Sequence, residues 1–126
     1  MGYYRDLKAW QVAHTLALEV SRAANQFPPH ERFELASRLR RAALSVPTNI
    51  AEGQARYGAR EALRYTRIAS GSLTEVDYLL LFAREKGYLD QPAYRRLDDL
   101  RTHAARLVIR LIRSLQQAAC SHPRPL

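Results

Sequence analysis

Polar side chains recur at every third or fourth position from residue 38 to residue 52, a spacing that places them along one flank of an α-helix. They are Arg38, Arg41, Ser45, Asn49 and Glu52. A later segment offers complementary groups, Arg64, Ser72 and Glu75. If both segments are helices that pair across a turn near position 57, Arg41 lies opposite Glu75, and Glu52 lies opposite Arg64. The serine and the asparagine between them are then hydrogen-bonded, and we call these residues together the polar stripe.

The polar stripe has two interpretations. Partnered polar groups at a helix contact commonly fix register and rotation, and this structural use is favoured here. Catalysis would need a base beside a serine or cysteine, but the histidines lie on different segments. They are His14, His30, His103 and His122. The sequence therefore predicts no catalytic residue, no cofactor and no enzymatic activity.

Metal and phosphate sites are weakly supported. His30 and Glu34 are spaced to share a helix face and to hold a metal weakly, but no third ligand is evident, and a helix start explains both. Gly71 lies within a helical pattern rather than in a glycine-rich loop, so we expect it to permit close helix packing. No metal site is predicted.

Arginines form a row on the last segment, on the side opposite its apolar positions. They are Arg95, Arg106, Arg110 and Arg113. No Asp or Glu follows Arg101, and the whole chain carries a net charge of +8 with arginine far in excess of lysine. One interpretation is a solvated surface and a genome rich in GC; the other is a surface that contacts phosphate, because guanidinium groups bind phosphate in a bidentate fork. Both interpretations remain open.

Four helices are expected to position these residues. Proline and glycine clusters divide the chain into segments 5–26, 30–56, 59–87 and 92–118, each with apolar residues at intervals of three and four, and a flexible tail at 119–126. Pro47 is expected to bend the second helix without breaking it. The short connections predict an all-α, antiparallel, up-down-up-down four-helix bundle that forms a single domain over residues 1–126.

Several apolar residues fall outside the predicted core faces. They are Phe33, Leu44, Tyr78, Leu79, Phe82, Ile109 and Ile112. A bundle this small cannot cover them itself, which predicts a homo-oligomer built on these surfaces. The single cysteine, Cys120, and the lack of a long apolar run predict a cytoplasmic protein with no role in a membrane.

Two stretches resemble a known family. The run from Arg40 to Gly53 contains Asn-Ile-Ala-Glu-Gly, and the run from Tyr65 to Glu75 contains Ala-Ser-Gly-Ser. Together with Tyr4-Arg5-Asp6-Leu7 near the start and Phe27-Pro28 further on, they resemble the bacterial four-helix-bundle family known as ribosomal RNA intervening-sequence proteins. The resemblance covers nearly the whole chain.

The resemblance implies a cytoplasmic bundle that assembles into a ring, usually a pentamer, without known enzymatic activity. Some members are encoded within insertions of large-subunit ribosomal RNA genes. Others are similar to the accessory variability protein of diversity-generating retroelements, which binds nucleic acid and a reverse transcriptase. We therefore expect an oligomeric accessory or scaffold protein that binds RNA or DNA through arginine-rich surfaces. The alternative is a scaffold for protein–protein interaction with no role in nucleic-acid binding.

Overall fold

Helices account for most of residues 3–121, the part of the chain that the computed structural model describes. The four α-helices are α1 (Lys8–Ala24), α2 (Leu35–Ala55), α3 (Ala59–Glu85) and α4 (Gln91–Ser121). Two short 3-10 helices, η1 (Tyr4–Asp6) and η2 (Pro29–Glu31), precede α1 and α2. No strand occurs within the described residues, and none of these helices combines the length and the apolar character needed to cross a membrane.

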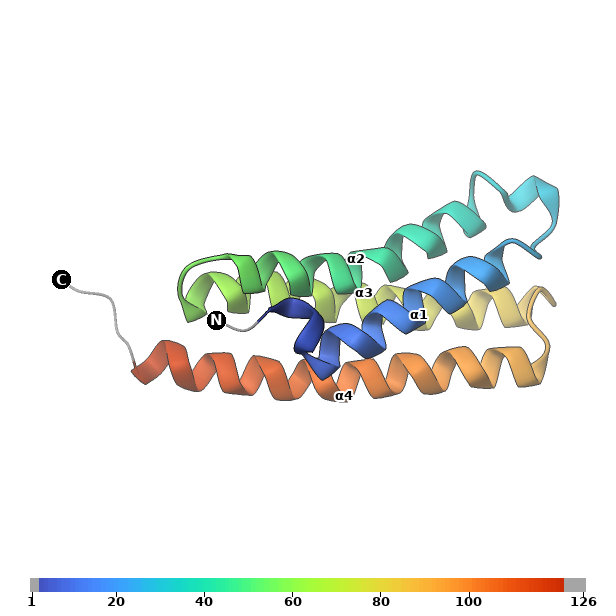
Figure 1. Cartoon of the computed structure of the whole chain (residues 1–126). Coiled ribbons are helices and arrows are strands. Elements are labelled where there is room, and N and C mark those ends of the chain that lie inside the picture. The colour runs from blue at the N-terminus through green and yellow to red at the C-terminus, as the bar shows by residue number, and fades with distance from the viewer. Residues whose placement is uncertain (1–2, 122–126) are drawn as a thin grey trace.

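Successive helices run in opposite directions and close into a bundle (Figure 1). Helix α1 packs against α2 and α4, and α3 packs against the same two helices. The predicted all-α, up-down-up-down four-helix bundle is therefore confirmed. The ring would involve several copies of the chain, and it stays a prediction.

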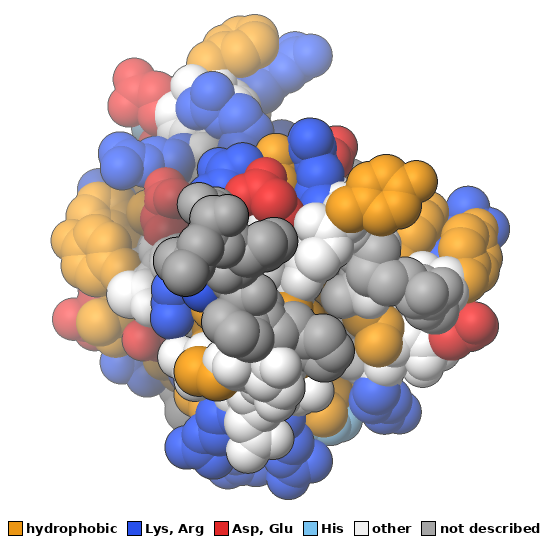
Figure 2. All heavy atoms as spheres, turned by 90° about the vertical axis from the view of Figure 1, so that its left-hand side faces the viewer, with side chains coloured by type: hydrophobic (Ala, Val, Ile, Leu, Met, Phe, Trp, Pro, Cys, Tyr) orange, Lys and Arg blue, Asp and Glu red, His pale blue; other side chains and the backbone are white. Residues whose placement is uncertain are grey.

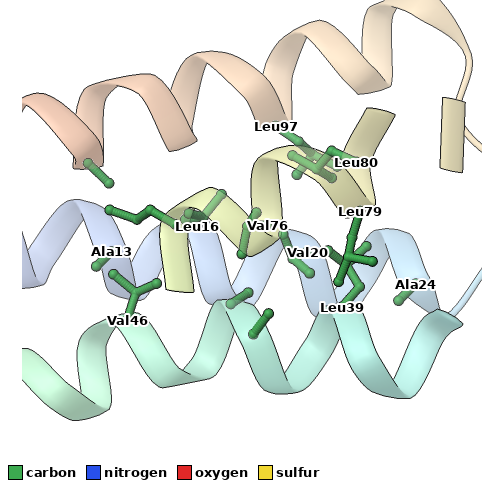
Figure 3. Close-up of a cluster of buried hydrophobic side chains, with 14 of the residues drawn as sticks. Ala13, Leu16, Val20, Ala24, Leu39, Val46, Val76, Leu79, Leu80 and Leu97 are labelled. Atoms are coloured by element: carbon green, nitrogen blue, oxygen red, sulfur yellow. The ribbon is translucent and has the colours of Figure 1, made fainter. Parts of the chain in front are cut away.

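Aliphatic side chains from all four helices fill the centre of the bundle (Figure 3). The largest side chains that are completely buried include Leu16, Leu39, Leu80 and Leu97, one from each helix. Each contributes about 1.5–3 kcal/mol through removal of its apolar surface from water. The predicted apolar faces therefore meet along one continuous core, which holds the polar surfaces described below in fixed positions.

The first two helices begin later than the sequence pattern predicts. Leu7 is extended, so the predicted helix 5–26 divides into η1 and α1. The second helix begins at Leu35 rather than at residue 30, because the chain after Pro28 forms η2 and a further turn first. The Glu31 carboxylate accepts a hydrogen bond of 3.5 Å from the Leu35 N–H, so this acid acts from outside the helix rather than within its first turn.

The last helix extends further than predicted. Helix α4 continues through Ser121, so residues 119–121 are helical and the predicted flexible tail is wrong there. The stretch from Gln116 to Ala119 contains good helix formers, and no proline interrupts the chain before Pro123. The rest of the predicted tail, residues 122–126, lies outside the described residues.

Helix α2 is continuous across Pro47, as predicted. Proline has no N–H to donate to the carbonyl four residues earlier, and its ring crowds that carbonyl. Figure 1 shows the axis of α2 changing direction near its middle, so that its first half diverges from its second. The predicted bend is therefore present, and the helix does not break.

Candidate nucleic-acid interface

The predicted arginines of α4 lie on its outer surface. Helix α4 turns Leu97, Ala104 and Val108 into the core. Because an α-helix repeats every 3.6 residues, the opposite side carries the predicted cations, all of them exposed. These are Arg95, Arg106, Arg110 and Arg113, which we call the α4 arginine row. In Figure 2, Lys and Arg side chains gather at the lower edge of the molecule, along α4.

The α4 arginine row differs from the neighbouring arginines in lacking partners. Arg101 of the same helix is held by Asp98 at 2.9 Å and by Asp77 of α3 at 3.6 Å. Within residues 3–121, no ion pair or hydrogen bond ties any member of the row to another side chain. One exposed acid, Asp99, shares this side of the helix near its start. The row therefore presents unneutralised positive charge to solvent.

The centre of the polar stripe is hydrogen-bonded as predicted. The hydroxyl oxygens of Ser45 on α2 and Ser72 on α3 lie 2.8 Å apart. The Asn49 side-chain amide donates to the Ser45 hydroxyl at 2.9 Å and to the Ser45 carbonyl at 2.8 Å. These half-buried groups connect α2 to α3 and satisfy one another, which fits the structural interpretation of the stripe.

Both predicted ion pairs of the polar stripe are wrong in their partners. Glu75 pairs with Arg38 at 3.3 Å rather than with Arg41. Arg38 lies about 60° closer to α3 around the helix axis, because three residues turn an α-helix through about 300°. Arg41 is exposed and borders a hollow of about 270 Å³ beside the same groups.

The second predicted pair forms within each helix instead of between them. Glu52 pairs with Arg56 at 3.4 Å, and Arg64 pairs with Glu61 at 3.2 Å. Side chains three or four residues apart on one helix are neighbours, so both groups find a partner one turn away. The hydrogen bond to Glu61 raises the pKa of the Arg64 guanidinium above its ordinary value.

His30 and Glu34 do not share a helix face, because the chain between them is not α-helical. The His30 ring instead lies 3.3 Å from the hydroxyl of Tyr88, which donates to the Glu31 carboxylate at 2.9 Å. Burial, and then this hydrogen bond, raise the pKa of the Tyr88 phenol. Among the described residues, no three His, Cys, Asp or Glu side chains are grouped to hold a metal ion.

Most of the predicted apolar surface residues are exposed, but two are not. The exposed fraction is 83% for Phe33, 60% for Leu44 and 61% for Tyr78, while Phe82 and Ile109 are exposed to a lesser extent. Leu79 is only 6% exposed, because its side of α3 turns inward, where it contributes to the core (Figure 3). Ile112 is half-buried against the core. Both were wrongly predicted as surface contacts.

The exposed residues Phe33, Tyr78 and Phe82 border one hollow of about 420 Å³ between the start of α2 and the end of α3. We call this hollow the apolar groove. Acidic and basic side chains also border it, namely Glu31, Glu34, Arg38, Arg41 and Lys86. The groove therefore combines aromatic surface with both signs of charge.

The sequence interpretation overlooked the turn between α2 and α3. Tyr57 is 97% exposed there and has arginines close to it on both sides in the chain. The available signal was the run Arg56-Tyr57-Gly58-Ala59-Arg60, in which an aromatic residue in a glycine turn separates two cations.

Residues 5–110 match the model of a protein family described as 23S rRNA-intervening sequence protein. The chain belongs to this family. No curated protein matches it. Among solved structures, this intervening-sequence family chain is similar to a protein of unknown function from the S23 ribosomal protein family of Bacteroides thetaiotaomicron VPI-5482. The two share 17% identity with a TM-score of 0.78, covering 83% of this chain and 95% of the other, so the similarity supports the fold alone.

Proposed function

We propose that this protein is a non-enzymatic, homo-oligomeric accessory protein of the cytoplasm that binds RNA or DNA through the α4 arginine row. The observation that carries the proposal is the exposure of four arginines on one side of α4 without a carboxylate partner in residues 3–121. Phosphate groups supply the partners that the chain itself does not. Each contact releases counterions from the nucleic acid, so binding weakens steeply as salt is added.

The proposal includes no catalytic step. Ser45 and Ser72 bond to each other and to Asn49, and none of these is a base that would remove a proton from a hydroxyl group. The aromatic ring of Trp10 stacks on His14 at 4.7 Å, at a surface remote from both serines in the chain. The polar stripe accordingly serves to align α2 with α3.

Self-association belongs to the same proposal. The apolar groove exposes Phe33 and Tyr78 on a chain of only 126 residues, and a second copy supplies both apolar surface and charges of both signs to match it. Assembly repeats the arginine row once per subunit. Several weak phosphate contacts then act together, which raises the overall affinity without a new contact.

The decisive experiment measures binding of labelled RNA and DNA, single-stranded and duplex, across a salt series. The variant replaces Arg106, Arg110 and Arg113 with Gln. On duplex DNA, it should lower the slope of log K against log salt by about 3, since each lost phosphate contact removes about 0.9. The control variant replaces three exposed cations of η1 and α1 with Gln, namely Arg5, Lys8 and Arg22.

The control loses the same charge and should retain most of the binding. Equal weakening by both variants would mean that net charge, rather than the α4 arginine row, attracts the nucleic acid. Light scattering on each sample checks that the mass is unchanged. The second candidate function, a protein-binding scaffold, is favoured by the apolar groove. It predicts no nucleic-acid binding even at low salt and a partner whose affinity changes little with salt.

A further inference from the structure

Tyr57 stands free at the end of the bundle where α2 turns into α3. Helix α2 ends at Ala55, and α3 begins at Ala59, so only three residues make the connection. Gly58 has a φ of +86°, a conformation that is strained for residues with a side chain, and it allows this short turn. The turn holds Tyr57 away from the core with 97% of its surface exposed. An aromatic side chain held in this way has both ring faces available to a ligand.

Cations surround this tyrosine, and one of them is unpaired. Arg56 and Arg64 lie over the ring of Tyr65, with guanidinium carbons 5.0 and 4.5 Å from its centre. Both are also neutralised by carboxylates on their own helices, those of Glu52 and Glu61. Arg60 is exposed, and no ion pair or hydrogen bond within residues 3–121 engages it. It is therefore the cation of the turn that is available to a phosphate.

The turn is continuous with the α4 arginine row. Gly58 and Ala59 border a hollow of about 350 Å³ together with Leu111, Ser114 and Leu115 of α4. Ser114 directly follows Arg113, the last arginine of the row. The face in Figure 2 is this end of the bundle, with the positive lower edge formed along α4. A chain of phosphates that follows the row therefore reaches the turn that carries Tyr57.

We propose that Tyr57 and Arg60 form a binding site for single-stranded nucleic acid, in which a base stacks on the tyrosine ring and a flanking phosphate contacts the arginine. The bases of a single strand expose their faces, whereas those of a duplex are covered by their neighbours. A duplex accordingly engages only the α4 arginine row. This inference rests on the proposed function, and it adds a preference for single strands.

The test compares binding of a short labelled oligo-dT strand and of a DNA duplex of equal length to the intact oligomer. Tyr57→Ala should weaken single-strand binding by about 5- to 150-fold, the range that corresponds to 1–3 kcal/mol for stacking on one base, and leave duplex binding unchanged. Tyr57→Phe keeps the ring and should restore single-strand binding. Arg60→Gln should lower the salt slope for the single strand by about 0.7.

Other outcomes separate this inference from the proposed function. If Tyr57→Ala leaves single-strand affinity unchanged while the α4 triple variant weakens it, the tyrosine site is wrong and the proposed function stands. Loss of duplex and single-strand binding together in Tyr57→Ala, or a change in oligomer mass, would assign Tyr57 to assembly and overturn the site. If the wild-type protein binds neither probe, the proposed function itself fails.

Discussion

Tyr88 connects two segments that are distant in the chain, because its hydroxyl donates to Glu31 while its ring lies 5.5 Å from that of Phe27. Burial and the Glu31 carboxylate raise the pKa of the phenol in the folded chain above its ordinary value of about 10. The folded state therefore favours the protonated phenol. Its contribution to stability is complete below the unfolded pKa and is lost as the pH rises through the folded one.

Tyr88→Phe should therefore lower the free energy of unfolding at neutral pH, because it removes the hydrogen bond to Glu31. The difference between the two proteins should shrink as the pH rises above about 10, where the unfolded phenol begins to ionise. Urea unfolding at several alkaline pH values measures this difference. Tyr78→Phe provides a matched control, since Tyr78 is largely exposed. A difference that stays constant with pH would refute the assigned role of Tyr88.

At the scale of the helix, Gly53 and Gly71 test what separates a packing glycine from an exposed one. A Cβ at Gly53 would lie 3.0 Å from the Ala62 carbonyl oxygen and 3.2 Å from the Tyr65 Cβ, so α2 and α3 would have to move apart. A Cβ at Gly71 would meet nothing within 4 Å, although the sequence pattern led us to expect close packing there. The helix contact therefore depends on Gly53.

The same substitution should thus have opposite effects at these two positions. Gly71→Ala should stabilise the protein by about 0.5–1 kcal/mol, the usual gain of alanine over glycine within a helix. Gly53→Ala gains the same preference, but the crowding against a backbone carbonyl should outweigh it, with a net loss of about 1 kcal/mol. Chemical denaturation gives both values. Stabilisation by Gly53→Ala would show that the two helices separate easily.

The same two helices show what a sequence can predict and what it cannot. Repeats of three and four specify which side of each helix is buried, so the four helices, their order and the contact between Ser45 and Ser72 were predictable. Ion pairs were not, because long side chains choose among several partners within a turn, as Arg38 did for Glu75. Leu79 was misplaced because its segment is apolar on nearly every side, so periodicity does not determine its rotation. The role of Tyr57 depends on the exposure of a turn.

For the whole molecule, surface area and exposed aromatic side chains bear on assembly. The chain exposes 7877 Å². An interface of ordinary size covers about 800 Å² of each partner, roughly a tenth of this surface. The apolar groove offers such a site a central aromatic cluster, and aromatic residues commonly dominate binding energy when they are fully desolvated. The groove should therefore contribute strongly to assembly, while the α4 arginine row lies on a different face.

Replacing Phe33, Tyr78 and Phe82 with Ser should accordingly lower the mass measured by light scattering towards that of a single chain. Leu18→Ser removes an exposed apolar residue of α1 outside the groove and should leave the mass unchanged. Circular dichroism must show that the helices of the triple variant remain folded. Because assembly multiplies phosphate contacts, the dissociated variant should bind a long single strand much more weakly than the wild type, yet bind a strand that spans only one subunit equally well. An oligomer of unchanged mass would place the interface elsewhere, and weaker binding to the short strand would mean that the groove itself contacts nucleic acid.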